Sequence, residues 1–259
     1  MNHRQVQRTL FRMQLDPAFA ARMRAGAPDV TSDLGAGELR LLRDADPNAI
    51  AADRDGKRRR QFLANVSSEF GLSVAAGLDV EGFTSSAEFH DAVRSDASLP
   101  MSFARYAAGC TLAQPAPLRA LVLLESALAQ GRRGLRKAPE PRPGELALAG
   151  SATLVDAPGG TLRLAADLRA ALDAGTALPA FLLPLAANET LLLRASPAAS
   201  AFRLREVSVE HVSPALASLL RETLSPCSRR ALGARLALSS GDLESVVDEL
   251  VADGVLAEG

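Results

Sequence analysis

The chain has 259 residues, of which 47% are hydrophobic, and a formal net charge of -1. This length and composition support a folded protein of two domains or of one domain with an appendage, and the charge gives no overall attraction to nucleic acid or to an anionic membrane. Cys110 and Cys227 lie far apart without a CxxC pair, which favours free thiols. Because the chain shows neither a signal-peptide pattern nor a run of ~20 apolar residues, we expect a soluble, cytoplasmic protein.

The first part of the chain has the periodicity of helices and carries most of the aromatic residues. A first helical pattern is interrupted at Asp16-Pro17, because proline breaks a helix. The helical patterns cover residues 6–23, 37–43, 49–77, 86–94, 101–109 and 118–132. We therefore expect an all-α domain over 1–131, with a core of large rings, and an exposed linker at the cation- and proline-rich segment 132–144.

The segment 41–77 combines a dense basic turn with an apolar stripe at helical spacing. Counted at 100° per residue, Arg59 falls inside the apolar arc between Phe62 and Phe70. One interpretation is that Arg59 pairs with a carboxylate of its own chain and that the neighbouring cations are solvated. The other is that Arg58, Arg59 and Arg60 dock another protein.

Beyond the linker the pattern becomes that of short strands, so residues 145–259 are expected to begin as a small β-sheet. Strands are predicted at 145–148, 152–155, 161–164, 180–186 and 190–195, with a turn at 157–160, a helix at 166–174 and a hairpin turn at 187–189. The segment 202–212 alternates first as Phe202/Leu204 and then as Val207/Val209. This shift of phase by one residue predicts a β-bulge.

The chain then returns to helical patterns at 215–224, 228–236 and 242–252, with a capping pattern formed by Ser239 and Asp242. Three helices with short turns, followed by Val255-Leu256, predict a winged-helix-like module. The expected fold class is therefore α+β: an N-terminal helical domain, then a small sheet and a C-terminal winged-helix-like module.

A winged helix often reads DNA, but residues 239–259 contain acids and neither lysine nor arginine. Phosphate would repel such a recognition helix. The preceding helix carries three arginines that could still touch a DNA backbone, namely Arg229, Arg230 and Arg235. A transcriptional regulator with an N-terminal effector domain therefore stays open as an alternative.

Residues for catalysis or metal binding are sparse. The histidines at 3, 90 and 211 are isolated, the cysteines are not grouped, and no nucleophile elbow or phosphate-binding loop occurs. Cys110 is more simply explained as a buried small residue than as an accessible thiol. We therefore expect no enzyme, no cofactor and no metal site in this chain alone.

The run 6–77, with LFRMQLDPAF and then RDADPNAIAADRDGKRRRQFLANVSSEFGLS, resembles the partner subunits of multinuclear non-heme iron oxidases in ribosomal peptide modification, such as the partner protein of the methanobactin system. The resemblance continues loosely to LRALVLLESALAQGRRG and includes no catalytic motif. It implies a non-catalytic protein that brings a precursor peptide to an oxidase, which would hold the iron. The C-terminal pattern also resembles the winged-helix modules that recognise peptides in ribosomal peptide biosynthesis, where a leader peptide pairs with a strand beside the helices, and this fits the family that the N-terminal part suggests.

Under this resemblance the alternating segment is the candidate peptide-binding edge, through Phe202, Leu204, Val207 and Val209. The helical domain would dock the oxidase, and neither nucleic acid nor membrane would be a partner. An interaction protein unrelated to peptide modification is a third interpretation.

Overall fold

The computed structural model describes residues 3–45, 63–95, 97–110, 115–134, 138–177, 186–196 and 204–259. It confirms a mixed α+β fold, in which a helical region precedes two small antiparallel sheets. The chain divides into two compact units, Met1–Gln114 and Pro115–Gly259, each of which is described by itself.

The first core of the N-terminal unit is formed by the helices α1 (His3–Leu15), α2 (Pro17–Ala25), α3 (Pro28–Thr31) and α4 (Ala36–Arg43). The expected break lies between α1 and α2, where Oδ1 of Asp16 accepts a hydrogen bond of 2.9 Å from the N–H of Phe19. Fully or nearly fully buried side chains hold these helices together, among them Val6, Met13, Met23 and Leu42.

The second core of this unit is aromatic, as the sequence predicts. It is built on α7 (Gly71–Ala75), the 3-10 helix η1 (Glu81–Ser85), α8 (Ala87–Ser95) and α9 (Leu99–Cys110). Phe70, Phe83, Phe89 and Phe103 are completely buried. Phe103 makes edge-to-face contacts with Phe70 at 4.8 Å and with Phe83 at 5.1 Å between ring centroids, a geometry that aromatic rings favour.

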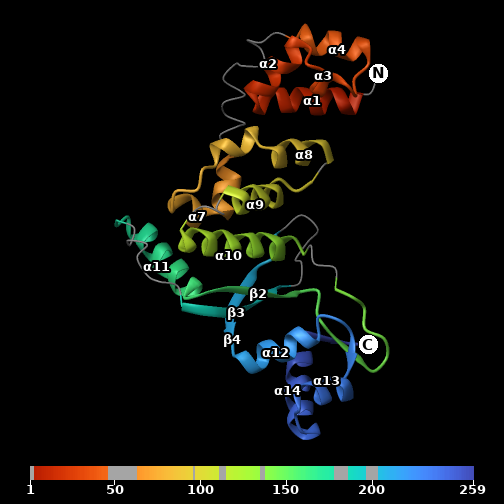
Figure 1. The fold of residues 1–259 in the computed structure, drawn as a ribbon, viewed down its shortest axis with the longest axis vertical. Coiled ribbons are helices and arrows are strands. Elements are labelled where there is room, and N and C mark those ends of the chain that lie inside the picture. The colour runs from red at the N-terminus through yellow and green to blue at the C-terminus, as the bar shows by residue number, and fades with distance from the viewer. Residues whose placement is uncertain are drawn as a thin grey trace. The chain divides into compact units, whose positions relative to one another are not determined.

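The C-terminal unit contains a three-stranded antiparallel sheet in the order β2 (Ala152–Gly159), β3 (Ala186–Ala195), β4 (Val207–Val212). The long helix α10 (Ala116–Arg133) lies along one face of this sheet, beside α11 (Thr161–Ala174) (Figure 1). Leu124 and Ala127 of α10 are buried against Val155 and Leu191 of the sheet. The unit boundary therefore precedes α10, whereas the sequence analysis placed the boundary after it, at 132–144.

The opposite face of the sheet packs on α12 (Pro214–Glu222), α13 (Arg229–Leu236) and α14 (Ser240–Ala252). A second small sheet has the order β5 (Cys227–Ser228), β1 (Glu145–Leu148), β6 (Leu256–Glu258). Leu192 and Val212 of the first sheet share one buried cluster with Leu146 and Leu148 of the second. A common core thus fixes the strands of both sheets and the three helices together.

Three predicted elements of this unit are wrong. Residues 157–160 were expected as a turn, but 157–159 belong to β2, where Ala157 pairs with Glu189 and Gly159 with Ala186 of β3. Residues 161–164 were expected as a strand but begin α11, because Thr161 starts the helix directly after the left-handed Gly160. Residues 187–189 were expected as a hairpin turn but lie inside β3, where Glu189 pairs with Ala157 of β2. In all three places long-range pairing and packing override a local pattern.

Candidate functional site

The strand β4 forms one edge of the three-stranded sheet. It pairs with β3 over its whole length, and within the described residues no strand pairs with its outer side. An edge strand presents a row of backbone N–H and C=O groups that another extended chain can pair with. The edge of β4 is therefore the first candidate for a binding site.

The register identifies the backbone groups that point to this open edge. The N–H of Ser196 donates 2.8 Å to the carbonyl oxygen of Glu206, so this pair is of the hydrogen-bonded type. Hydrogen-bonded and non-hydrogen-bonded pairs alternate along an antiparallel ladder. Since Ala195↔Val207, Leu193↔Val209 and Leu191↔His211 follow as non-hydrogen-bonded pairs, the backbone groups of Val207, Val209 and His211 face outward.

The side chains of β4 alternate between two different environments. Val207 and Val209 pack against the buried cluster beneath α10 and are partly buried. Ser208 and Glu210 lie on the other face and are exposed, and Oε1 of Glu210 is 3.2 Å from Nε of Arg194 on β3. A strand added at this edge would meet apolar side chains on one face and polar side chains on the other.

The beginning of β4 is attached to the end of α10. The N–H of Arg205 donates 2.9 Å to the carbonyl oxygen of Arg132, and a methyl group built on Gly131 would lie 3.2 Å from Cγ2 of Val207. Helix α10 ends at Gly134, whose φ of 58° is one that glycine adopts without strain. These contacts hold the start of the edge strand against the helix that covers the sheet.

The end of β4 leads into α12, which is joined to the sheet by a polar cluster. Nη2 of Arg221 donates to Oδ1 of Asp156 on β2 and, at 2.7 Å, to the hydroxyl of Thr190 on β3. The hydroxyl of Thr190 in turn donates 2.9 Å to Oδ1 of Asp156. The hydrogen bond from Thr190, and next the Arg221 guanidinium, lower the pKa of Asp156.

The structure places some of the predicted peptide-binding residues at this edge. Val207 and Val209 lie in β4, whereas Leu204 precedes the strand and is 54% exposed. The predicted bulge is absent from 207–212, which pairs with β3 in an unbroken register. The alternation of side chains changes phase between Leu204 and Val207 because Leu204 precedes the strand, which begins at Val207. Phe202, Arg58, Arg59 and Arg60 lie outside the described residues.

Two of the three arginines that might have touched DNA are held by carboxylates of their own unit. Arg229 is bonded through Nη1 to Asp248 at 2.6 Å and through Nε and Nη2 to Glu258 at 3.1 Å each. The carboxylate of Glu258, and next that of Asp248, raise the pKa of Arg229. Arg235 pairs with Glu222 at 3.0 Å. These guanidinium groups join α13 to its neighbours in the unit.

The described residues offer no group of three or more histidine, cysteine, aspartate or glutamate side chains placed to hold a metal ion. Both cysteines are free, as expected, but Cys110 is exposed and not buried as the sequence analysis had favoured, because it lies at the C-terminal end of α9. Cys227 is buried, and this burial raises the pKa of its thiol. Among the described helices none is long and apolar enough to span a membrane.

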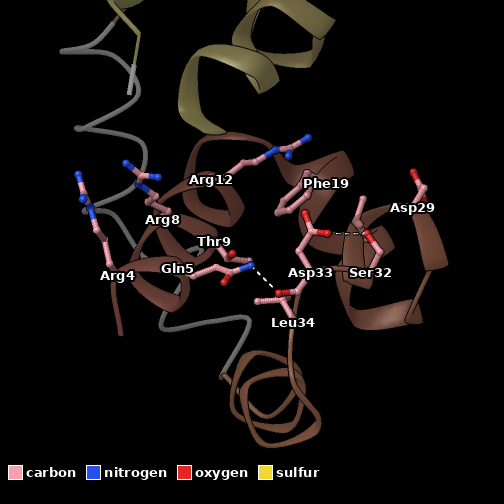
Figure 2. A pocket seen from close by; sticks show the side chains of 11 residues that line it. Arg4, Gln5, Arg8, Thr9, Arg12, Phe19, Asp29, Ser32, Asp33 and Leu34 are labelled. Atoms are coloured by element: carbon pink, nitrogen blue, oxygen red, sulfur yellow. Dashed lines mark hydrogen bonds between the residues drawn. The ribbon is translucent and has the colours of Figure 1, made fainter. Parts of the chain in front are cut away.

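A second candidate site, which the sequence analysis did not single out, lies in the N-terminal unit. It is a hollow of about 330 Å³ between α1 and the segment from Asp29 to Leu34 (Figure 2). Arginines from successive turns of α1 line it, at positions 4, 8 and 12. Their spacing of four residues places them along one side of the helix, and this signal was readable in the sequence.

Neither a protein-family model nor a curated protein matches the chain.

Proposed function

We propose that the protein is a non-catalytic partner that presents a ribosomally made precursor peptide to an iron-dependent oxidase. The open edge of β4 carries this proposal, because Val207, Val209 and His211 direct donors and acceptors outward at the two-residue repeat of an extended peptide. The oxidase as partner is suggested by the resemblance of residues 6–77.

The surroundings of β4 suit a strand-adding function. The strand is fixed at its beginning by α10 and at its end by α12, so little order must be gained when a peptide binds. We propose that the helices α12–α14 with β5, β1 and β6 form a winged-helix-like module, and that this module is the frame of the peptide site.

The two faces of β4 also define the sequence that the edge would select. Side chains of the peptide on the α10 face would meet Val207 and Val209, which favours apolar residues there. On the opposite face they would lie beside Ser208 and Glu210, which favours polar or basic residues. The proposed ligand is therefore a peptide of alternating apolar and polar or basic residues.

A transcriptional regulator is the second candidate, favoured by the order of α12–α14 alone. The ion pairs of Arg229 and Arg235 and the acidic residues of α14 weigh against this function, because phosphate contacts supply much of the affinity for DNA. Retention on heparin at low salt would favour the regulator.

The proposal is tested by looking for an iron-dependent oxidase and a precursor peptide encoded beside the protein, co-expressing the protein with that oxidase and measuring iron in the purified complex. In parallel, fluorescence polarisation measures binding of the labelled leader segment of the neighbouring precursor peptide. We expect an iron-containing complex and saturable peptide binding that Val207→Pro weakens, since proline removes an outward N–H. Full binding by a folded Val207→Pro protein would place the peptide elsewhere, and absence of a complex would exclude the oxidase.

A further inference from the structure

A hollow of about 540 Å³ lies in the C-terminal unit, between α13 and α14. Most of the residues that line it are apolar, and three of them are small, namely Gly233, Ala234 and Ala237. Two leucines complete this apolar lining: Leu243 is buried, whereas Leu238 is 44% exposed. None of the residues that line the hollow belongs to β4, so it is built from other residues than the proposed peptide edge.

The close approach of the two helices shapes this hollow. A methyl group built on Gly233 of α13 would lie 3.1 Å from Cδ2 of Leu243 on α14. Among the described residues other than glycine, Ala237 alone has a positive φ, of 53°, and it ends α13. The N–H of Leu238 then donates 3.2 Å to the carbonyl oxygen of Gly233. The backbone of Leu238 is therefore fixed beside the hollow although its side chain is largely open to solvent.

Two exposed charges of opposite sign line the same hollow, Arg230 from α13 and Glu244 from α14. Within the part of the chain that the structure describes, neither side chain takes part in a hydrogen bond or an ion pair. Arg229 also lines the hollow, but Asp248 and Glu258 hold its guanidinium group. The charges available to a partner are thus one guanidinium group on one helix and one carboxylate on the other.

A surface with this composition complements itself. A two-fold axis brings the same patch of two copies face to face, so that each residue of a contacting pair is matched once in each direction. Arg230 of one copy can then pair with Glu244 of the second, and Glu244 of the first with Arg230 of the second. The exposed Leu238 of each copy can likewise pack into the hollow of the other, where the small residues leave room.

We infer that this hollow is the interface of a two-fold dimer of the chain, with Arg230 and Glu244 paired across the axis and Leu238 of each copy in the hollow of the other. A second copy supplies the acid, the base and the apolar side chain that the surface requires. Because such an interface is small, the dimer dissociates at concentrations on the order of micromolar. Neither the peptide nor the oxidase takes part in this contact, so self-association and the proposed function can fail separately.

The test is analytical ultracentrifugation of the full chain over a range of micromolar concentrations, at low and at high salt. The variants are Arg230→Glu, Glu244→Arg and Leu238→Ser, measured alone, together with an equal mixture of the first two. Arg169→Glu and Glu249→Arg are the matched controls, because they make the same charge changes at exposed positions that do not line the hollow. Circular dichroism shows that each variant is folded.

We expect the wild type to show a monomer–dimer equilibrium that shifts toward the monomer as salt is added. Arg230→Glu and Glu244→Arg each place like charges opposite one another, so either change alone should raise the dissociation constant at least about tenfold. Leu238→Ser removes the apolar contact and should raise the dissociation constant by a similar factor. The two control variants should dimerise as the wild type does.

The mixture gives the most specific result. In a mixed dimer of Arg230→Glu and Glu244→Arg chains, both facing pairs are again of opposite sign, so mixing two variants that are separately monomeric should restore the dimer. A misfolded variant would not recover in this way. A wild type that stays monomeric, single reversals that leave its dimerisation unchanged, or folded variants whose mixture stays monomeric would each overturn the inference.

Discussion

A proline scan across β4 tests the direction of its backbone groups. The substitutions are Val207→Pro, at an outward-facing N–H, and Ser208→Pro, at an N–H that faces β3. Ser208 belongs to the hydrogen-bonded pair with Arg194, and its hydroxyl also lies 3.5 Å from the carbonyl oxygen of Arg194. Val207→Ala and Ser208→Ala are the matched controls, because they remove the side chains without removing an N–H.

The hydrogen-bond ladder between β3 and β4 determines how much stability each proline substitution should cost. Ser208→Pro removes one ladder bond and leaves the Arg194 carbonyl without its donor, which should lower the free energy of unfolding by roughly 2–4 kcal/mol relative to Ser208→Ala. Val207→Pro leaves the ladder with β3 intact and should cost less than about 1 kcal/mol relative to Val207→Ala.

Urea denaturation followed by circular dichroism gives these differences. The assay is independent of any ligand, so it tests the geometry of the edge alone. A Val207→Pro protein that loses as much stability as Ser208→Pro would mean that Val207 faces β3, and the proposed peptide edge would be refuted.

Three further changes test other parts of the structure. Arg12→Met keeps a long, unbranched apolar side chain but removes the cation, so thermal denaturation should show a loss of at least the ~0.5–2 kcal/mol of a cation–π contact with the Phe19 ring, and wild-type stability would contradict that contact. Asp156→Asn should be less stable than the wild type at pH 7. Because Thr190 and Arg221 lower the pKa of Asp156, its contribution is full above the unfolded-state pKa of ~3.9 and disappears as the pH falls through the lower folded-state value, so the two melting temperatures should converge in acid, and a constant gap would contradict this. Ala237→Gly should raise the stability by about 0.5–1 kcal/mol, because Ala237 has a φ of 53° that glycine adopts without strain, whereas a loss would show that the methyl group contributes packing.

Much of the helical architecture could be predicted because its signals are local. The break at Asp16-Pro17 and the cap at Ser239 depend on side chains within three residues, and both are confirmed. The strand that begins at Val207 was also predicted, because its side chains alternate between apolar and polar along the sequence. Residues 187–189 were assigned to a turn, because only the pairing with β2 shows that they continue a strand.

The candidate sites could be predicted only in part. The sequence indicated an alternating strand, but the outward direction of Val207, Val209 and His211 depends on its register with β3, which local sequence does not encode. The spacing of Arg4 and Arg8 places them on a shared side of one helix, a signal that the sequence analysis did not use. The hollow beside them depends on residues that the fold brings to α1, such as Asp33.

Amide hydrogen exchange of the edge strand, measured by NMR with and without the precursor's leader segment, tests the central proposal most directly. Before the peptide is added, the amides of Ser208 and Glu210 should exchange slowly because they are bonded to β3, while those of Val207, Val209 and His211 should exchange fast. Saturating peptide should slow these three outward amides selectively. Peptide that binds without changing their exchange would contradict the proposal that β4 accepts it as a strand.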